Sequence, residues 1–129
     1  MSQDFEAIRY KLVEQQIRPW KVDDLEVLGT LHQIPRENFV SADQKVLAFI
    51  DTKLPLPGAK NDSQVMLEPK MEARLLQALK PQKTERALEV GAGSGYMAAL
   101  LAVHAKSVVS VDIDPEMVTL AKSNLARAY

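Results

Sequence analysis

The chain has 129 residues, a formal net charge of −1, 47% hydrophobic and 26% charged residues, and no cysteine. This is the composition of one globular domain; it excludes disulfides and zinc–thiolate sites, and the near-zero charge argues against nucleic-acid or membrane-surface partners. The charged N-terminus is not a signal peptide and no stretch reaches ~18 apolar residues, so we expect a cytoplasmic protein.

The first part of the chain is predicted to be helical. Residues 3–17 carry apolar residues at helical spacing, and Pro19 stops that helix. Asp23 and Glu26 form an Asp-x-x-Glu capping pattern at the start of a second helix, which ends at Pro35. One face of that helix is predicted to carry Leu25, Leu28 and Leu31.

Less regular segments follow. Residues 42–49 predict a short third helix capped by Ser41, and residues 51–63 contain too many prolines and turn formers for a regular element. Pro69 suits the first turn of another helix, which ends before Pro81. The apolar face predicted for this helix consists of Met71, Leu75, Leu76 and Leu79.

In the last part of the chain, predicted strands alternate with helices. Residues 86–90 predict a strand, and residues 107–113 a second strand that is apolar enough to be buried on both faces. A helix follows each strand, the second one capped by Asp114 with Pro115 at its first position. We therefore expect an α/β fold, with a helical lead-in over 1–80 and the first β-α-β-α unit of a doubly wound Rossmann-like sheet over 81–129.

The turn between the first strand and its helix reads "GAGSG", with glycines at 91, 93 and 95. Glycine permits positive φ and lets a ligand approach the backbone, and the following helix N-terminus offers free N–H groups. The alternative is a tight turn that binds nothing, but one glycine usually suffices for that. The loop is therefore a candidate ligand site.

Two acids flank this loop and define the ligand. Tyr96 stands where a dinucleotide-binding loop needs its third glycine, and Glu89 before the loop would repel a pyrophosphate. Asp112 ends the second strand, where a carboxylate can accept both ribose hydroxyls. Its alternative role is to cap the last helix, which Asp114 fills better. A nucleoside with a cationic tail and no phosphate fits this pattern, which describes S-adenosylmethionine.

At these residues the chain resembles a known group. "LEVGAGSGY" and "SVDID" are similar to motif I and the following acidic motif of class I S-adenosylmethionine-dependent methyltransferases. The resemblance implies that the loop passes the amino-acid part of the cofactor and that the second acid binds ribose. The cofactor-binding residues it implies are Glu89, Gly91, Ala92, Gly93, Ser94, Gly95, Asp112 and Met66.

The lead-in narrows the resemblance to the protein-L-isoaspartate O-methyltransferases. The matching stretches are "LVEQQIRPWKVDD", "VLGTLHQIPRENFV", "AFIDTKLPLP" and "LEVGAGSGYMAALLA". The resemblance implies methyl transfer to a carboxylate of damaged protein, which is a repair reaction, with a protein or peptide substrate. It also implies that the lead-in helices cap the sheet and that the segment 51–71 lies over cofactor and substrate.

One stretch departs from that family. Its loop carries Thr-x-Ser-x-Pro, whose serine hydroxyl lies nearest the substrate carboxylate, whereas this chain has Val65 and Leu67 at the two hydroxyl positions. Ser63 could replace the serine only if the loop shifted register. Asp51 matches a family acid beside the loop, with loop ordering and substrate contact both open. The catalytic residues are therefore not assigned by the resemblance.

This departure bears on the acceptor more than on the chemistry. A carboxylate nucleophile is ionised at pH 7 and needs no general base, so the protein mainly supplies position. Leu67 presents an apolar surface at the position where the family has a hydrogen-bonding hydroxyl, and the charge of Glu68 disfavours an anionic substrate. We therefore expect isoaspartyl activity to be weak or absent.

The remaining candidate residues are expected to have structural roles. His32 and His104 have no partner pattern, Trp20 is expected to anchor packing, and no metal site is expected.

The class it resembles has about seven strands, and this chain supplies two. It therefore looks like the N-terminal part of a longer protein, with a naturally short paralogue as the alternative. We expect the 129-residue chain to be inactive, to lack part of the adenine pocket, and to self-associate as a homodimer through the strand at 86–90. Three functions stay open: an isoaspartyl methyltransferase, a methyltransferase of that lineage with another acceptor, and a non-catalytic S-adenosylmethionine-binding domain.

Overall fold

A computed structural model describes residues 4–128 of the chain. The elements, in chain order, are α1 (Phe5–Lys11), a π-helical segment η1 (Leu12–Ile17), a 3₁₀ turn η2 (Arg18–Trp20), α2 (Leu25–Gln33), two 3₁₀ segments η3 (Arg36–Phe39) and η4 (Ala42–Phe49), β1 (Leu54–Pro55), β2 (Val65–Met66), α3 (Pro69–Leu79), β3 (Arg86–Val90), α4 (Tyr96–His104), β4 (Ser107–Val111) and α5 (Pro115–Ala128).

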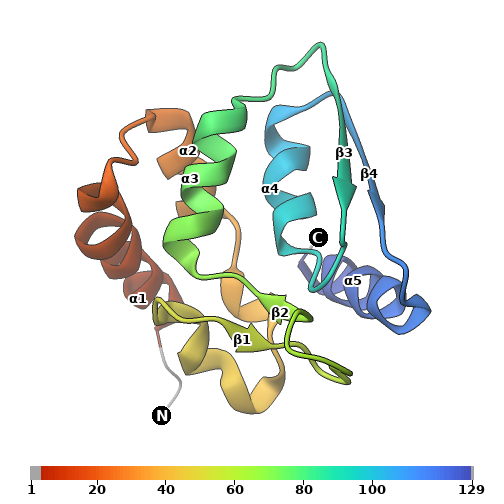
Figure 1. The fold of residues 1–129 in the computed structure, drawn as a ribbon. Helices are drawn as coiled ribbons and strands as arrows, with labels where there is room; N and C mark the ends of the chain where they lie inside the picture. Colours follow the sequence, from red (N-terminus) through yellow and green to blue (C-terminus); the bar gives the residue numbers. More distant parts are fainter. Residues whose placement is uncertain (1–3, 129) are drawn as a thin grey trace.

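The second half is the predicted β-α-β-α unit. β3 and β4 pair in parallel, from Arg86 opposite Ser107 to Val90 opposite Val111, and α4 connects them. Figure 1 shows α4 between this sheet and the lead-in helices, with α3 beside it. The expected α/β architecture is confirmed, and it brings the carboxyl ends of both strands to the same edge of the sheet.

Within residues 4–128 the helices cover only one face of that sheet. Ala87 and Val108 pack against the core, whereas Leu88 is 67% and Val90 is 80% exposed on the other face. Side chains alternate between faces with a period of two, so every second apolar residue is left uncovered. The prediction that strand 107–113 is buried on both faces is wrong for this chain, in which Val109 is exposed as well.

The core lies between the lead-in helices and the inner side of α4. Its largest fully buried apolar side chains are Phe39, Ile17, Leu76, Leu100, Met117, Val13 and Val22. They come from η1, η3, α3, α4, α5 and the segment before α2, so that the lead-in and the β-α-β-α unit share one core. The boundary expected near residue 80 is thus a change of secondary structure within one packed body.

The first predicted helix differs in its details. Its expected start at residue 3 lies outside the described residues, and the chain is α-helical only over Phe5–Lys11 before a π-helical segment takes over. A π-helical segment places extra residues in each turn, and here its buried residues are Leu12, Val13 and Ile17. The helical path ends at Lys21, whose φ is 64°, just after Pro19.

The capping residue of α2 was misplaced by one position. Asp24, not Asp23, is the N-cap, and its Oδ1 accepts hydrogen bonds from the backbone N–H groups of Glu26 and Val27 at 2.9 and 3.3 Å. The predicted apolar face is correspondingly rotated. Leu25 is 74% exposed, while Leu28 and Leu31 are buried as expected.

The segment from residue 41 to residue 66 contains two further differences. Residues 42–49 form a 3₁₀ segment, and Ser41 Oγ donates to Gln44 Oε1 instead of capping the backbone. The region expected to be an irregular loop contains β1, which pairs antiparallel with β2 through Leu54–Met66 and Pro55–Val65. This short pair brings the two ends of the covering loop together.

Helix α3 starts at Pro69 as predicted but presents another face to the core. Its buried residues are Pro69, Glu72, Ala73 and Leu76. Leu76 is therefore buried as predicted, whereas Met71, Leu75 and Leu79 are exposed. Leu75 lines a cavity with Val90, and Leu79 lines one with Leu88, so both lie beside the uncovered face of β3.

Candidate functional site

The glycine loop between β3 and α4 adopts a conformation that favours glycine. The φ angles are 97° at Gly91, 52° at Gly93 and 87° at Gly95, all in the left-handed region. A Cβ at Gly95 would also lie 3.1 Å from the carbonyl oxygen of Ala121 in α5. At Gly91 an added Cβ would meet nothing within 4 Å, so the backbone there is open to a ligand.

Asp112 is held against this loop. Its Oδ2 accepts a hydrogen bond from the Gly93 N–H at 3.2 Å, and its Oδ1 accepts one from the Asp114 N–H at 2.9 Å. Gly93 and Asp112 are 19 positions apart in the sequence, and the parallel pairing of β3 and β4 brings them together.

Asp114 caps α5, as expected. Its Oδ1 accepts the Glu116 N–H at 3.0 Å, and its Oδ2 lies 2.6 Å from Lys60 Nζ. The hydrogen bonds from Lys60 and Gln64 lower the pKa of Asp114 to about 2. Asp112 is therefore not needed as the helix cap, so capping does not explain its position at the glycine loop.

Glu89 lies at the end of β3, beside these groups. Burial raises the pKa of Glu89, and the negative charge of Asp112 raises it further. A hydrogen bond of 2.6 Å, which Ser110 Oγ donates to Glu89 Oε1, acts in the opposite direction. A partly buried carboxylate beside a second carboxylate favours a cationic partner, because that partner would relieve both effects.

A cavity of about 210 Å³ opens where these elements meet. Hereafter called the cofactor cavity, it is lined by Val65, Met66, Leu67, Glu72, Leu75, Glu89, Val90, Gly91, Ala92, Gly93, Ser94 and Met97. Six of the eight predicted cofactor residues are among them. The other two, Gly95 and Asp112, adjoin it, Gly95 at the start of α4 and Asp112 through its bond to Gly93.

A buried ion pair that was not predicted from the sequence supports the loop that covers this cavity. Arg36 Nη1 lies 2.6 Å from Glu72 Oε1, and Arg36 Nη2 donates to the Leu67 carbonyl oxygen at 2.8 Å. The guanidinium also lies 4.7 Å from the centroid of the Tyr96 ring. Arg36 thereby fixes the backbone at Leu67. The sequence features that could have indicated this ion pair are the arginine of "IPREN" and an acid on the helix that follows the loop.

Burial of this network shifts its acids. Burial raises the pKa of Tyr96 to about 12, and it raises the pKa of Glu72 despite the pair with Arg36. Arg36 neutralises Glu72, and the residues that line the cofactor cavity within the described chain include no lysine, arginine or histidine. Glu89 therefore leaves the cavity with an excess negative charge.

The two weaker catalytic candidates lie elsewhere. The backbone N–H and the hydroxyl of Ser63 both donate to Asn61 Oδ1, and Ser63 does not line the cofactor cavity. Asp51 Oδ1 accepts the Lys70 N–H at 3.1 Å at the start of α3, and Asp51 Oδ2 pairs with Lys70 Nζ. Leu67, at the position of the family serine, does line the cavity.

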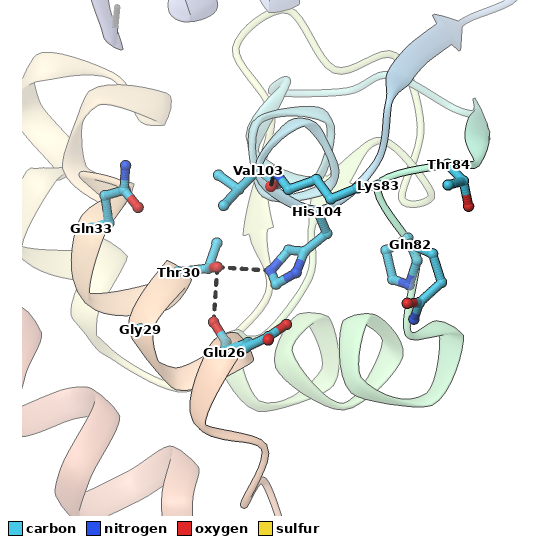
Figure 2. A pocket seen from close by; sticks show the side chains of 10 residues that line it. Glu26, Gly29, Thr30, Gln33, Gln82, Lys83, Thr84, Val103 and His104 are labelled. Carbon is cyan, nitrogen blue, oxygen red and sulfur yellow. Dashed lines mark hydrogen bonds between the residues drawn. The ribbon is translucent and has the colours of Figure 1, made fainter.

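The histidines make structural contacts. His32 stacks on Tyr10 with ring centroids 5.2 Å apart. His104 lies 2.7 Å from Thr30 Oγ1, which itself donates to the Glu26 carbonyl oxygen, so this contact joins α4 to α2 (Figure 2). The contact borders a cavity beside α2 that is also lined by Gln33, Gln82 and Lys83.

Trp20, expected from the sequence to anchor packing, lies at the surface against Lys70. It is 56% exposed, and Lys70 Nζ lies 3.8 Å from its ring centroid. Over residues 4–128 no group of histidine, aspartate and glutamate side chains is arranged to hold a metal ion. Within the same residues, no helix is long and apolar enough to cross a membrane.

Comparison with known proteins agrees with this geometry. The family model for protein-L-isoaspartate(D-aspartate) O-methyltransferase (PCMT) matches residues 7–129. A protein-L-isoaspartate O-methyltransferase from Methanoculleus marisnigri is 39% identical over 120 residues, which are 93% of this chain and 53% of that protein. Another from Marinobacter nauticus is 35% identical, covering 98% of this chain and 56% of the relative.

Solved structures show the same fold. A Plasmodium falciparum protein described as a protein-L-isoaspartate O-methyltransferase in complex with S-adenosyl-L-homocysteine superposes with a TM-score of 0.75 and 23% identity, covering 98% of this chain and 57% of that one. A second protein-L-isoaspartate O-methyltransferase gives a TM-score of 0.74 with 28% identity, over 92% of this chain and 38% of the other. The chain thus spans about half the length of the curated relatives it matches, and it belongs to the protein-L-isoaspartate(D-aspartate) O-methyltransferase family.

Proposed function

We propose that the whole protein transfers a methyl group from S-adenosylmethionine to a carboxylate of a protein or peptide. The observation that carries this proposal is the meeting of Glu89 and the glycine loop at one cavity of negative charge, with Asp112 bonded to the loop beside it. The complex of the Plasmodium falciparum relative with S-adenosyl-L-homocysteine supports the choice of cofactor.

The residues of the cofactor cavity suit each part of that cofactor. Bound S-adenosylmethionine would supply the methyl group from its sulfonium, and the neutral thioether that remains is the leaving group. The open backbone at Gly91 admits the amino-acid part, and Glu89 favours its positive charge. Asp112 accepts the ribose hydroxyls, and Met66 closes the cavity from the covering loop.

Isothermal titration calorimetry of the full-length protein with S-adenosyl-L-homocysteine tests this assignment. We expect binding by the wild type and weaker binding by Glu89→Gln, which keeps the shape of the side chain and removes its charge. No binding by the wild-type protein would refute the proposal.

The acceptor is a separate question, because Leu67 replaces the serine of the family loop. Its side chain lines the cofactor cavity and its carbonyl is fixed by Arg36. The hydroxyl that would bond a substrate carboxylate is therefore replaced by an apolar surface. This observation favours a second candidate, a methyltransferase of the same lineage with another acceptor, over repair of isoaspartyl residues. Turnover of isoaspartyl peptide by the full-length protein, compared with other carboxylate acceptors, separates the two.

A non-catalytic cofactor-binding domain is the third candidate. It predicts binding of S-adenosyl-L-homocysteine with no methyl transfer to any acceptor. The inactivity of the 129-residue chain on its own and its cytoplasmic location stay predictions.

A further inference from the structure

A hairpin lies across the glycine loop. It consists of residues 54–66, which are β1, β2 and the turn between them, and we call it the strap. Leu56 of the strap is buried, and its Cδ1 lies 3.4 Å from the position that a Cβ at Gly93 would occupy. Gly93 is also the residue whose N–H donates to Asp112. The strap therefore covers the glycine loop beside the carboxylate that we assign to the ribose.

The turn of the strap is fastened to the start of α5. Lys60 Nζ lies 2.6 Å from Asp114 Oδ2 and 3.4 Å from Glu116 Oε2. Gln64 Nε2 donates to the same oxygen of Asp114 at 2.9 Å, and Gln64 Oε1 accepts the Lys60 N–H at 2.6 Å. The turn that joins β1 to β2 can be followed toward α5 in Figure 1. These contacts form a latch between the strap and the helix that follows Asp112.

The two sides of this latch differ in how firmly they are held. Asp114 is buried, and its Oδ1 accepts the Glu116 N–H as the cap of α5, which leaves Oδ2 for Lys60 and Gln64. The Lys60 side chain, in contrast, is 52% exposed. An ion pair made by an exposed lysine is weak and is screened by salt. The latch can therefore open while the cap of α5 stays in place.

The cofactor cavity is small while the strap is closed. The described residues enclose about 210 Å³, whereas sites for small molecules commonly measure about 300–1,000 Å³. Gly91 is the exposed residue of the glycine loop. A molecule that contacts both Gly91 and Asp112 extends along Gly93, where Leu56 packs. The closed strap therefore occupies part of the path that the cofactor needs.

We propose that the strap is a gate, which lifts from the glycine loop before S-adenosylmethionine enters and before S-adenosyl-L-homocysteine leaves, and that Lys60 is the positioning residue that holds it closed. This inference rests on the proposed methyltransferase function, because it concerns the same cofactor cavity. Neither Lys60 nor Asp114 lines that cavity, so their contact favours the closed strap equally with and without bound cofactor. Lys60 therefore controls the rates of entry and release and not the affinity.

Binding kinetics of labelled S-adenosyl-L-homocysteine with the full-length protein, followed by rapid filtration, test the latch. In Lys60→Ala we expect the rate constants of association and release each to rise about threefold, as for the loss of an exposed ion pair, and the dissociation constant to stay within about twofold of the wild type. Lys60→Arg keeps the charge and should match the wild type. Salt at about 1 M should bring the wild type to the rates of Lys60→Ala, because the Debye length falls to about 3 Å. Unchanged rates in Lys60→Ala, or a change in affinity alone, would overturn the role of Lys60.

A cleavable cross-link tests the gate itself. The 129 residues contain no cysteine, so Lys60→Cys combined with Glu116→Cys supplies one attachment point on the strap and one on α5. A short bis-maleimide with an internal disulfide then joins them, and each single-cysteine variant, treated in the same way, is the matched control. We expect the joined strap to slow both the entry of S-adenosyl-L-homocysteine and its release, when it is bound beforehand, at least about tenfold, and reduction of the linker to restore both rates.

Wild-type rates of entry and release in the cross-linked protein would overturn the gate. Failure of the proposed function gives a different result, because the wild-type protein would then bind no S-adenosyl-L-homocysteine before any cross-link is made.

Discussion

Replacing Asp112 by alanine should weaken cofactor binding at least tenfold. A carboxylate offers about four acceptor positions, and two of them are used by the N–H groups of Gly93 and Asp114. The remaining two match the two hydroxyls of a ribose. Each such hydrogen bond contributes about 1 kcal/mol, and more with a charged acceptor, so losing both costs about 2 kcal/mol or more.

Isothermal titration calorimetry of the full-length protein with S-adenosyl-L-homocysteine measures this loss. Asp112→Asn keeps one acceptor oxygen and should fall between the wild type and Asp112→Ala. Asp114→Ala is the control for loop stability, because it removes the cap of α5 and the pair with Lys60 but no residue that lines the cofactor cavity. Wild-type affinity in Asp112→Ala, or an equal loss in Asp114→Ala, would refute the ribose assignment.

Four further predictions concern the acceptor, the buried ion pair, a surface pair and the sheet edge. Isoaspartyl peptide turnover by the full-length protein should be weak and should increase in Leu67→Ser; robust wild-type turnover would contradict this. Arg36→Met should lower the free energy of unfolding in urea by about 3–5 kcal/mol, because it leaves Glu72 buried without its cation, and adding Glu72→Met should restore part of it. The pKa of Asp114 is lowered to about 2 mainly by Lys60, so the stability it contributes is present above its unfolded pKa and is lost as the pH falls through about 2; in Lys60→Ala, NMR titration should show that pKa rising toward 3.8, and an unchanged value would exclude Lys60 as the cause. The 129-residue chain should self-associate, because β3 pairs on one side only within the described residues and exposes Leu88 and Val90; light scattering that shows a monomer at tens of micromolar would contradict this.

Local patterns were enough to predict the β-α-β-α unit, which supplies the glycine loop and the two acids of the site. The two strands, the glycine loop and the Asp114–Pro115 helix start each depend on short-range chemistry, and parallel pairing then brings Asp112 to Gly93. The sequence order of acid, glycines and acid therefore corresponds to a spatial arrangement.

Tertiary packing decided the features that were mispredicted. The apolar stripe of α3 appeared to mark its buried face, but Leu75 and Leu79 lie beside the open face of β3 while the charged Glu72 is buried with Arg36. No local pattern pairs Arg36 with an acid 36 positions away. The surroundings of Trp20 could not be predicted for the same reason, since Lys70 and Arg74, which contact its ring and its carbonyl oxygen, lie in α3, far along the chain.

The most direct test of the central claim is the transfer of a labelled methyl group. The full-length protein is incubated with methyl-labelled S-adenosylmethionine and a mixture of proteins and peptides, and the product is then treated with mild base. Methyl esters of carboxylates hydrolyse under these conditions and release labelled methanol, whereas methyl groups on nitrogen stay bound. We predict base-labile label that depends on intact Glu89 and Asp112; no transfer at all, or only base-stable label, would contradict the proposed carboxylate methyltransferase.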